Sequence, residues 1–225
     1  MEINLTKNQE ANIAEYNKRS EKKELRKKVL ALRNNLPESW RREASEAIID
    51  KITTLPEYQQ AEALFCYVSY RSEVETDALI QKALQEGKSV YCPKVIAGEH
   101  IPCMEFYRIF SVEDLETGFR GIREPIPLPA RQFCISEHFV KQICTNGSSI
   151  LFVMPGAVFD KNHHRIGYGG GYYDAYLKRC KQAGIKEHML TVALAFSKQI
   201  VEKVVAEPHD IKPKLVITEE KDDKL

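Results

Sequence analysis

The sequence predicts a single-domain α/β fold, in which helices cover both faces of a largely parallel β-sheet. Short apolar runs typical of buried strands alternate with longer segments whose apolar positions repeat at helical spacing. The 225 residues are 43% apolar and 29% charged, as in globular proteins, and no internal repeat or linker divides them. The polar residues 1–19 are predicted to be an N-terminal extension, frayed or continuous with the next helix, and residues 20–225 a single domain.

The expected elements follow one another along the chain. Helices are expected over residues 20–36, 39–55, 76–86 and 172–183, and strands over residues 62–70, 88–95, 104–110, 150–156, 191–196 and 214–218. Thr76 is the expected N-cap of the third helix, and Gly87 and Gly184 are expected to end the third and fourth helices.

Charge and cysteine usage exclude several classes of protein. The formal net charge is +1, so no basic excess indicates a nucleic-acid partner. The apolar runs are too short to span a membrane, and the N-terminus lacks the apolar core of a signal peptide, so a cytoplasmic protein is expected. The six cysteines form no CxxC pair, which favours reduced thiols over a disulfide framework or a metal cage. A monomer is expected.

The densest motif is the glycine run "GYGGGYYD", residues 167–174, between a strand-like run and an amphipathic helix. Glycines at such a turn let backbone N–H groups approach phosphate oxygens, and at least one of them should have a positive φ. The dinucleotide fingerprint would need a glycine at position 172, and the P-loop would need a lysine after the last glycine, so neither template fits. A phosphate-binding loop of another kind and a tight turn over packed tyrosines both remain open.

Two charged residues flank the run. Asp174 lies in the first turn of the expected helix, where a carboxylate stabilises the helix dipole or, beside bound phosphates, could ligate Mg²⁺. Arg165 precedes the first glycine by two residues and could give a forked contact to phosphate.

The segment "MPGAVFDKNHHRIGYGGGYYDAYL" closely resembles the hallmark segment of the 5-formyltetrahydrofolate cyclo-ligase family. Three further segments, "KKELRKKVLALR", "YVSYRSEVETDALI" and "PHDIKPKLVITE", resemble other parts of that family in the same order. The resemblance implies a Rossmann-like sheet of the sugar-phosphate isomerase and coenzyme A transferase type. It also implies a ligase of one-carbon metabolism that cyclises 5-formyltetrahydrofolate to 5,10-methenyltetrahydrofolate with ATP and Mg²⁺, through phosphorylation of the formyl oxygen.

The same resemblance implies roles for individual residues. ATP binding falls to Lys22, Lys23, Glu24, Leu25, Arg26, Arg165, Ile166, Gly167, Tyr168, Gly169, Gly170, Gly171, Tyr172 and Tyr173. Arg165 and Tyr173 are the implied catalytic residues, Val68, Glu73 and Tyr172 the folate-contacting residues, and Asp174 and Asp210 the metal ligands. Some relatives carry Arg and Lys where this chain has Tyr168 and Gly170, and Lys214 stands where many members carry an acidic residue, which weakens the assignment of Asp210.

Two other functions compete with this interpretation. A sugar-phosphate isomerase or coenzyme A transferase on a related scaffold would keep the anion-binding loop without requiring ATP. A non-catalytic nucleotide-binding regulatory module would keep the nucleotide site alone.

Overall fold

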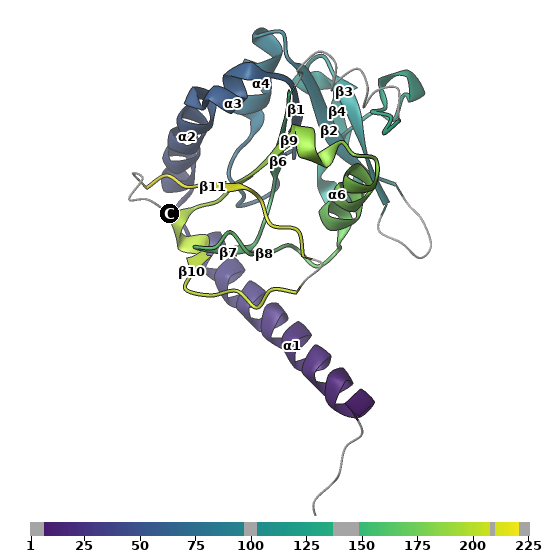
Figure 1. Cartoon of the computed structure of the whole chain (residues 1–225). Coiled ribbons are helices and arrows are strands. Elements are labelled where there is room, and N and C mark those ends of the chain that lie inside the picture. The colour runs from purple at the N-terminus through teal and green to yellow at the C-terminus, as the bar shows by residue number, and fades with distance from the viewer. Residues whose placement is uncertain (1–6, 97–102, 137–148, 208–209, 221–225) are drawn as a thin grey trace, which may run out of the picture.

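The computed structural model of the protein describes residues 7–96, 103–136, 149–207 and 210–220 (Figure 1). The helices are α1 (Lys7–Asn34), α2 (Glu38–Thr54), α3 (Pro56–Gln60), α4 (Asp77–Gln85) and α6 (Tyr172–Gln182), with short 3₁₀ turns η1 (Val112–Asp114), η2 (Phe119–Gly121), η3 (Pro129–Arg131), η4 (Lys186–His188) and η5 (Ser197–Gln199). The strands are β1 (Ala61–Cys66), β2 (Ser89–Ile96), β3 (Cys103–Ile109), β4 (Leu115–Thr117), β5 (Arg123–Pro125), β6 (Ser149–Met154), β7 (Val158–Asp160), β8 (Arg165–Ile166), β9 (Met189–Leu194), β10 (Ile200–Val201) and β11 (Leu215–Ile217).

The main sheet has six strands in the order β11-β9-β6-β1-β2-β3. Every neighbouring pair from β11 to β2 is parallel, and β3 joins the edge as an antiparallel strand. The register places Leu64 beside both Val90 and Leu151, so the centre of the sheet is apolar. This arrangement confirms the predicted largely parallel α/β sheet.

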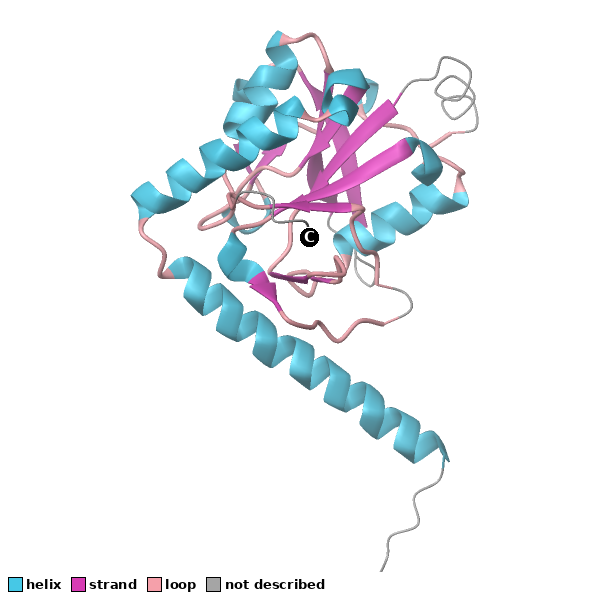
Figure 2. Cartoon of the chain, turned by 60° about the vertical axis from the view of Figure 1, so that its left-hand side comes forward, coloured by secondary structure: helices cyan, strands magenta, loops and turns pink. Residues whose placement is uncertain are grey.

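Helices cover both faces of this sheet, as expected (Figure 2). Along β1 the side chains alternate: Leu64 and Cys66 belong to the core cluster shared with α2 and α4, whereas Phe65 belongs to the cluster shared with α6. The α6 side is rich in aromatic contacts, such as Phe65 with Phe106 at 5.0 Å between ring centroids. A sheet buried on both faces explains why its central strands read as continuous apolar runs.

Helix α1 lies across one end of the sheet and extends beyond the body of the molecule (Figure 1). Its inner half packs through Val29 against Val158 and Ile166 of the small sheet β10-β7-β8. Residues 7–19 continue this helix, which is the second of the two alternatives expected for the polar extension.

The segment after β1 differs from the prediction. The strand ends at Cys66 rather than at Tyr70, because the following backbone bonds to a side chain instead of a neighbouring strand. The Thr76 hydroxyl donates to the Tyr67 carbonyl at 2.9 Å and accepts from the Ser69 N–H at 3.0 Å. Thr76 therefore occupies the predicted N-cap position of α4, but its hydroxyl holds the preceding loop and makes no cap bond to the helix.

Both predicted stop glycines are confirmed. Gly87 has φ +78° and Gly184 has φ +73°, a backbone region that favours glycine. The short strands of the two small sheets were not predicted, since two or three residues are too few to show a periodic pattern.

In the part of the chain that the structure describes, no helix is long and apolar enough to cross a bilayer. The described cysteines are free, and Cys144 lies outside the described residues.

Candidate functional site

The glycine run forms a loop between β8 and the first turn of α6, at the end of the sheet where α1 lies (Figure 1). Gly169 has φ +95°, and Gly171, which precedes the first helical residue, has φ +69°. The expectation of a positive φ in the run is therefore confirmed. Gly170 is needed for a different reason: a Cβ there would lie 2.6 Å from the Tyr172 ring.

Helix α1 places the guanidinium of Arg26 against this loop. Arg26 donates from Nε to the Gly167 carbonyl at 2.7 Å, and its Nη1 lies 3.4 Å from where a Cβ on Gly169 would stand. Burial lowers the pKa of Arg26, but a guanidinium remains charged at neutral pH. The loop carries no Lys or Arg of its own between residues 167 and 171, so α1 supplies positive charge at its surface.

Lys22, one turn before Arg26, faces the same end of the sheet. Its Nζ donates to Glu207 Oε2 and to Asp210 Oδ2, both at 2.6 Å, and the side chain is 13% exposed. Burial alone would lower the pKa of Lys22, but its hydrogen bonds to the two carboxylates and their charges outweigh burial and raise the pKa. Lys23 and Glu24 point to solvent, whereas Leu25 packs against the small sheet.

Arg165, which is buried, and Asp174, which is half-buried, form an ion pair beneath the loop. The Arg165 Nη2 donates to both Asp174 carboxylate oxygens at 2.9 Å, and Nη1 donates to the Pro155 carbonyl at 3.3 Å. The Ile211 N–H donates to Asp174 Oδ1 at 3.2 Å, which ties the C-terminal segment to the start of α6. Arg165 therefore orients Asp174 in this structure, and a direct contact from Arg165 to phosphate stays a prediction.

One backbone bond links the segments that carry the predicted metal ligands: Ile211, which follows Asp210 in the chain, donates its N–H to Asp174. Their oxygen donors are of the type that Mg²⁺ prefers, and Mg²⁺ usually takes one or two carboxylates with phosphate and water. Among the described residues no group of three or more possible ligands is assembled. Both carboxylates are paired with cations in this structure, Asp174 with Arg165 and Asp210 with Lys22, so their role as Mg²⁺ ligands stays a prediction.

A second network joins the loop to the segment after β1. Arg33 of α1 donates to the Tyr168 hydroxyl at 2.7 Å and to Ser72 Oγ at 3.0 Å. The Tyr168 hydroxyl lies beside Glu73, whose Oε2 accepts from the Tyr70 N–H at 2.9 Å. Burial raises the pKa of Glu73, and Tyr168, Tyr70 and Arg33 partly offset this by stabilising the carboxylate.

The other two predicted folate contacts, Tyr172 and Val68, differ in how far they are exposed at the site. The Tyr172 ring is half-buried and lies 6.2 Å from the Phe119 ring, so it forms a wall shared with the turn η2. Val68 is only 3% exposed and packs in the core cluster with α2 and α4, where its side chain supports the loop from behind. Tyr173 lies between both core clusters, and burial raises its pKa well above the usual value, so it stays protonated at neutral pH.

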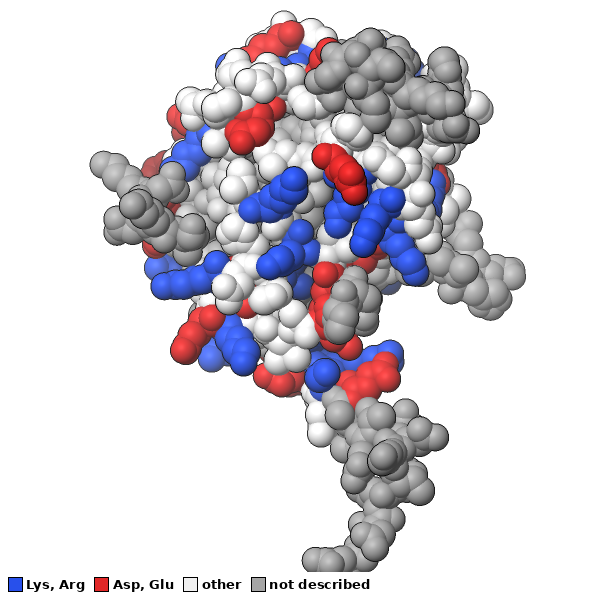
Figure 3. Space-filling view, in the orientation of Figure 1, with Lys and Arg blue, Asp and Glu red and all other residues white. Residues whose placement is uncertain are grey.

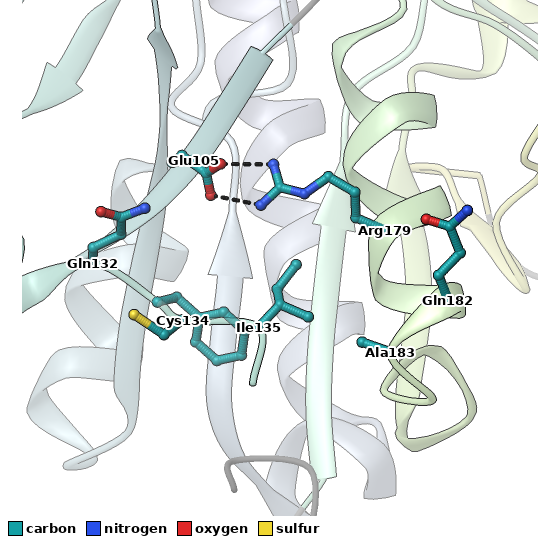
Figure 4. A pocket seen from close by; sticks show the side chains of 8 residues that line it. Glu105, Gln132, Cys134, Ile135, Arg179, Gln182 and Ala183 are labelled. Carbon is teal, nitrogen blue, oxygen red and sulfur yellow. Dashed lines mark hydrogen bonds and ion pairs between the residues drawn. The ribbon is translucent and has the colours of Figure 1, made fainter. Parts of the chain in front are cut away.

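The face that carries α6 has two further features. Glu105 and Arg179 form a bidentate ion pair, at 2.6 and 3.1 Å, in a depression of about 530 Å³ (Figure 4). Lys and Arg side chains gather over η4 and α6 (Figure 3), and burial together with Lys181 and Lys214 lowers the pKa of Lys186. The depression and these lysines include none of the predicted site residues.

Comparisons with known proteins decide the family. The family model described as the 5-formyltetrahydrofolate cyclo-ligase family matches residues 18–219. The chain belongs to this family. A mouse 5-formyltetrahydrofolate cyclo-ligase is 31% identical over 77% of this chain and 81% of its own length.

A solved structure of a family member supports the fold assignment. The Aquifex aeolicus 5,10-methenyltetrahydrofolate synthetase has a TM-score of 0.70 and 32% identity, with 89% of this chain and 90% of that chain covered. An Arabidopsis thaliana relative, 31% identical over 77% of this chain, is named as mitochondrial. The expected cytoplasmic location is therefore not established by the family.

Sequence reasoning missed the two arginine-centred connections to the loop. Arg33 lies 135 residues from Tyr168, and Arg26 lies 141 residues from Gly167, so no local pattern reveals either contact. Arg33 is 4% exposed, which is unusual for an arginine, but its place on a helix rich in basic residues conceals this in the sequence.

Proposed function

We propose that the protein catalyses the ATP-dependent cyclisation of 5-formyltetrahydrofolate to 5,10-methenyltetrahydrofolate, with release of ADP and phosphate. Family membership over residues 18–219 is the observation that carries this proposal. The site agrees with it, because a glycine loop contacted by Arg26 lies beside a half-buried carboxylate, Glu73, on a separate loop. One end suits a polyphosphate and the other suits a ring with N–H donors.

The chemistry requires activation of a poor electrophile. The formyl oxygen attacks the γ-phosphorus of ATP, the bond to ADP breaks, and a phosphorylated formyl group forms. N10 then attacks the formyl carbon, loses its proton, and phosphate leaves with the formyl oxygen. The protein's part is to hold both substrates in contact and to balance charge, as in other phosphoryl transfers.

The nucleotide end is assigned to the loop and to α1. Backbone N–H groups of residues 167–171 face the phosphates, and Arg26 adds positive charge from above the loop. Lys22, one turn before Arg26 on the same helix, is assigned to the phosphates as well, and it is held in place by Glu207 and Asp210. Asp174 and Asp210 would hold Mg²⁺ together with the phosphates, and the ion supplies charge neutralisation at the oxygens between which the phosphoryl group moves.

The folate end is assigned to Glu73 and Tyr172. Glu73 accepts from pterin N–H donors in its ionised form, which Tyr168 and Tyr70 favour against the effect of burial. Tyr172 lines the space between the two substrates. Tyr173 stays protonated and donates a hydrogen bond rather than accepting a proton.

The wider organisation follows from this proposal. Residues 20–225 act as one catalytic domain, and α1 extends from it toward the N-terminus as far as Lys7. The enzyme works as a monomer in the cytoplasm, with small-molecule substrates and without nucleic-acid or membrane partners.

The direct test is incubation with ATP, Mg²⁺ and 5-formyltetrahydrofolate, followed by ultraviolet absorbance of the methenyl product. We expect product only when both ATP and Mg²⁺ are present. Arg26→Gln should raise the KM for ATP strongly, whereas Arg42→Gln, which removes an exposed charge from α2, should not. Product formed at the same rate without nucleotide would contradict the proposal.

A further inference from the structure

Tyr168 carries the one side chain larger than a hydrogen atom in residues 167–171. The other four positions of this run are glycines, and residues 168–171 are all exposed. Glycine loses more conformational freedom than any other residue when the chain becomes ordered, so a ligand that fixes this run must offset a large entropy loss. Any contact that a side chain of the run makes with the rest of the protein is made by Tyr168.

The Tyr168 hydroxyl reaches inward to a buried arginine. It accepts from Arg33 Nη1 at 2.7 Å, and Arg33 is 4% exposed although Tyr168 itself is 44% exposed. Because a guanidinium can only donate, the hydroxyl keeps its own proton for a second partner. The Glu73 carboxylate lies beside the hydroxyl and is stabilised by it in the ionised form. One hydroxyl therefore joins the glycine run to the carboxylate assigned to the folate.

Arg33 also holds the loop that carries Glu73. Its Nε donates to Ser72 Oγ at 3.0 Å, and Ser72, which is buried, directly precedes Glu73. The Ser72 hydroxyl donates in turn to Asn34 Oδ1, so the end of α1 holds this loop at two points. The guanidinium of Arg33 therefore contacts the nucleotide loop through Tyr168 and the folate loop through Ser72.

This arrangement links the order of one loop to the order of the other. Phosphates that fix residues 167–171 also fix the Tyr168 hydroxyl, and with it the position of the Glu73 carboxylate. A folate that binds next then loses less conformational entropy in ordering the groups around it. Linked binding is reciprocal, so bound folate must strengthen nucleotide binding by the same factor.

We propose that Tyr168, held by Arg33, is a positioning residue that makes ATP and the folate bind cooperatively. The proposal rests on the proposed function, since it requires a nucleotide at the glycine run and a folate at Glu73. The Tyr168 hydroxyl acts through the Glu73 carboxylate and not on the reacting atoms. The protein thereby favours the complex with both substrates over a complex with either one.

The test measures binding without turnover. Calorimetry gives the dissociation constant of 5-formyltetrahydrofolate with and without Mg²⁺ and saturating β,γ-imido-ATP, which does not transfer its γ-phosphoryl group. In the unaltered protein the nucleotide analogue should lower this constant by about 5-fold or more, and in Tyr168→Phe by less than about 2-fold. Tyr176→Phe removes a buried hydroxyl from the core cluster shared with α6, and as the matched control it should keep the full factor.

This factor separates positioning from a general structural role. A variant whose loops are only damaged binds the folate more weakly by the same ratio with and without the analogue, so its factor is unchanged. An unchanged factor in Tyr168→Phe would therefore overturn the proposal. Arg33→Gln should also lower the factor, but it should lower it no further when Tyr168→Phe is already present. A further loss in the double variant would overturn the assigned route through Tyr168.

The unaltered protein distinguishes this inference from the proposed function on which it rests. Binding of both ligands with no change in either dissociation constant would overturn the inference and leave the proposed function standing. Binding of neither ligand, together with no methenyl product from ATP, Mg²⁺ and 5-formyltetrahydrofolate, would instead refute the proposed function.

Discussion

Tyr168→Phe removes the hydroxyl that connects the glycine loop with α1 and with Glu73. The hydroxyl accepts from Arg33 Nη1 at 2.7 Å, and Arg33 is 4% exposed, so the variant leaves a buried guanidinium with one acceptor fewer. Its bond from Nε to Ser72 remains. A hydrogen bond to a charged group contributes about 1.5–3 kcal/mol, and we expect a loss of unfolding free energy in that range at neutral pH.

The same change alters the pH dependence with a definite sign. Burial raises the pKa of Glu73 and the Tyr168 hydroxyl opposes this, so its removal raises the pKa further. A carboxyl with a raised folded-state pKa lowers stability as pH rises from its unfolded to its folded pKa. The destabilisation by Tyr168→Phe should therefore be larger at neutral pH than in acid, where Glu73 is protonated. Folate binding, which needs the carboxylate, should weaken at a higher pH than in the unaltered protein.

Urea unfolding and folate titration across a range of pH measure both effects. Tyr16→Phe, which removes an exposed hydroxyl from α1, is the matched control and should change neither. Glu73→Gln should abolish the acid-side loss of folate binding. An equal destabilisation at every pH, with the folate profile unmoved, would refute the assigned network.

Two further predictions concern the loop and the ion pair beneath it. Gly169→Val should abolish ATP binding, because the new side chain would contact Arg26 at a position where φ is +95°. Gly87→Val is the control: φ is +78° there and the surrounding space is open, so this change should lower only the melting temperature. Calorimetry with ATP on both folded variants checks this, and normal affinity in Gly169→Val would mean that the glycine serves only the turn. Arg165→Ala should lower the free energy of unfolding by about 2–4 kcal/mol, because it leaves the half-buried Asp174 without its cation. Adding Asp174→Asn should recover part of that loss. Additive effects of the two changes in urea unfolding would contradict the pairing.

The layered fold could be predicted because its signal is local. Each central strand is buried on both faces, so β1 and β6 read as unbroken apolar runs, and α6 shows its buried stripe at helical spacing. The end of β1 could not be predicted. The apolar run continues to Val68, but the Thr76 hydroxyl takes the backbone bonds that would have extended the strand.

The site was predictable only where residues are adjacent in the chain. The glycine run predicted a positive φ and a turn into a helix, and both are present at Gly171. The pairing of Lys22 with Glu207, and of Arg33 with Tyr168, depends on how α1 crosses the end of the sheet. That crossing is a tertiary feature, for which a solvated basic helix face gives no sign in the sequence.

The proposed enzyme consumes one ATP for each methenyl product that it forms at this loop. The most direct measurement follows ADP and methenyl absorbance together in one reaction with Mg²⁺ and 5-formyltetrahydrofolate. We expect equal amounts of ADP and methenyl product at every time point, and no ADP when the folate is omitted. Methenyl product without a matching amount of ADP would contradict this expectation.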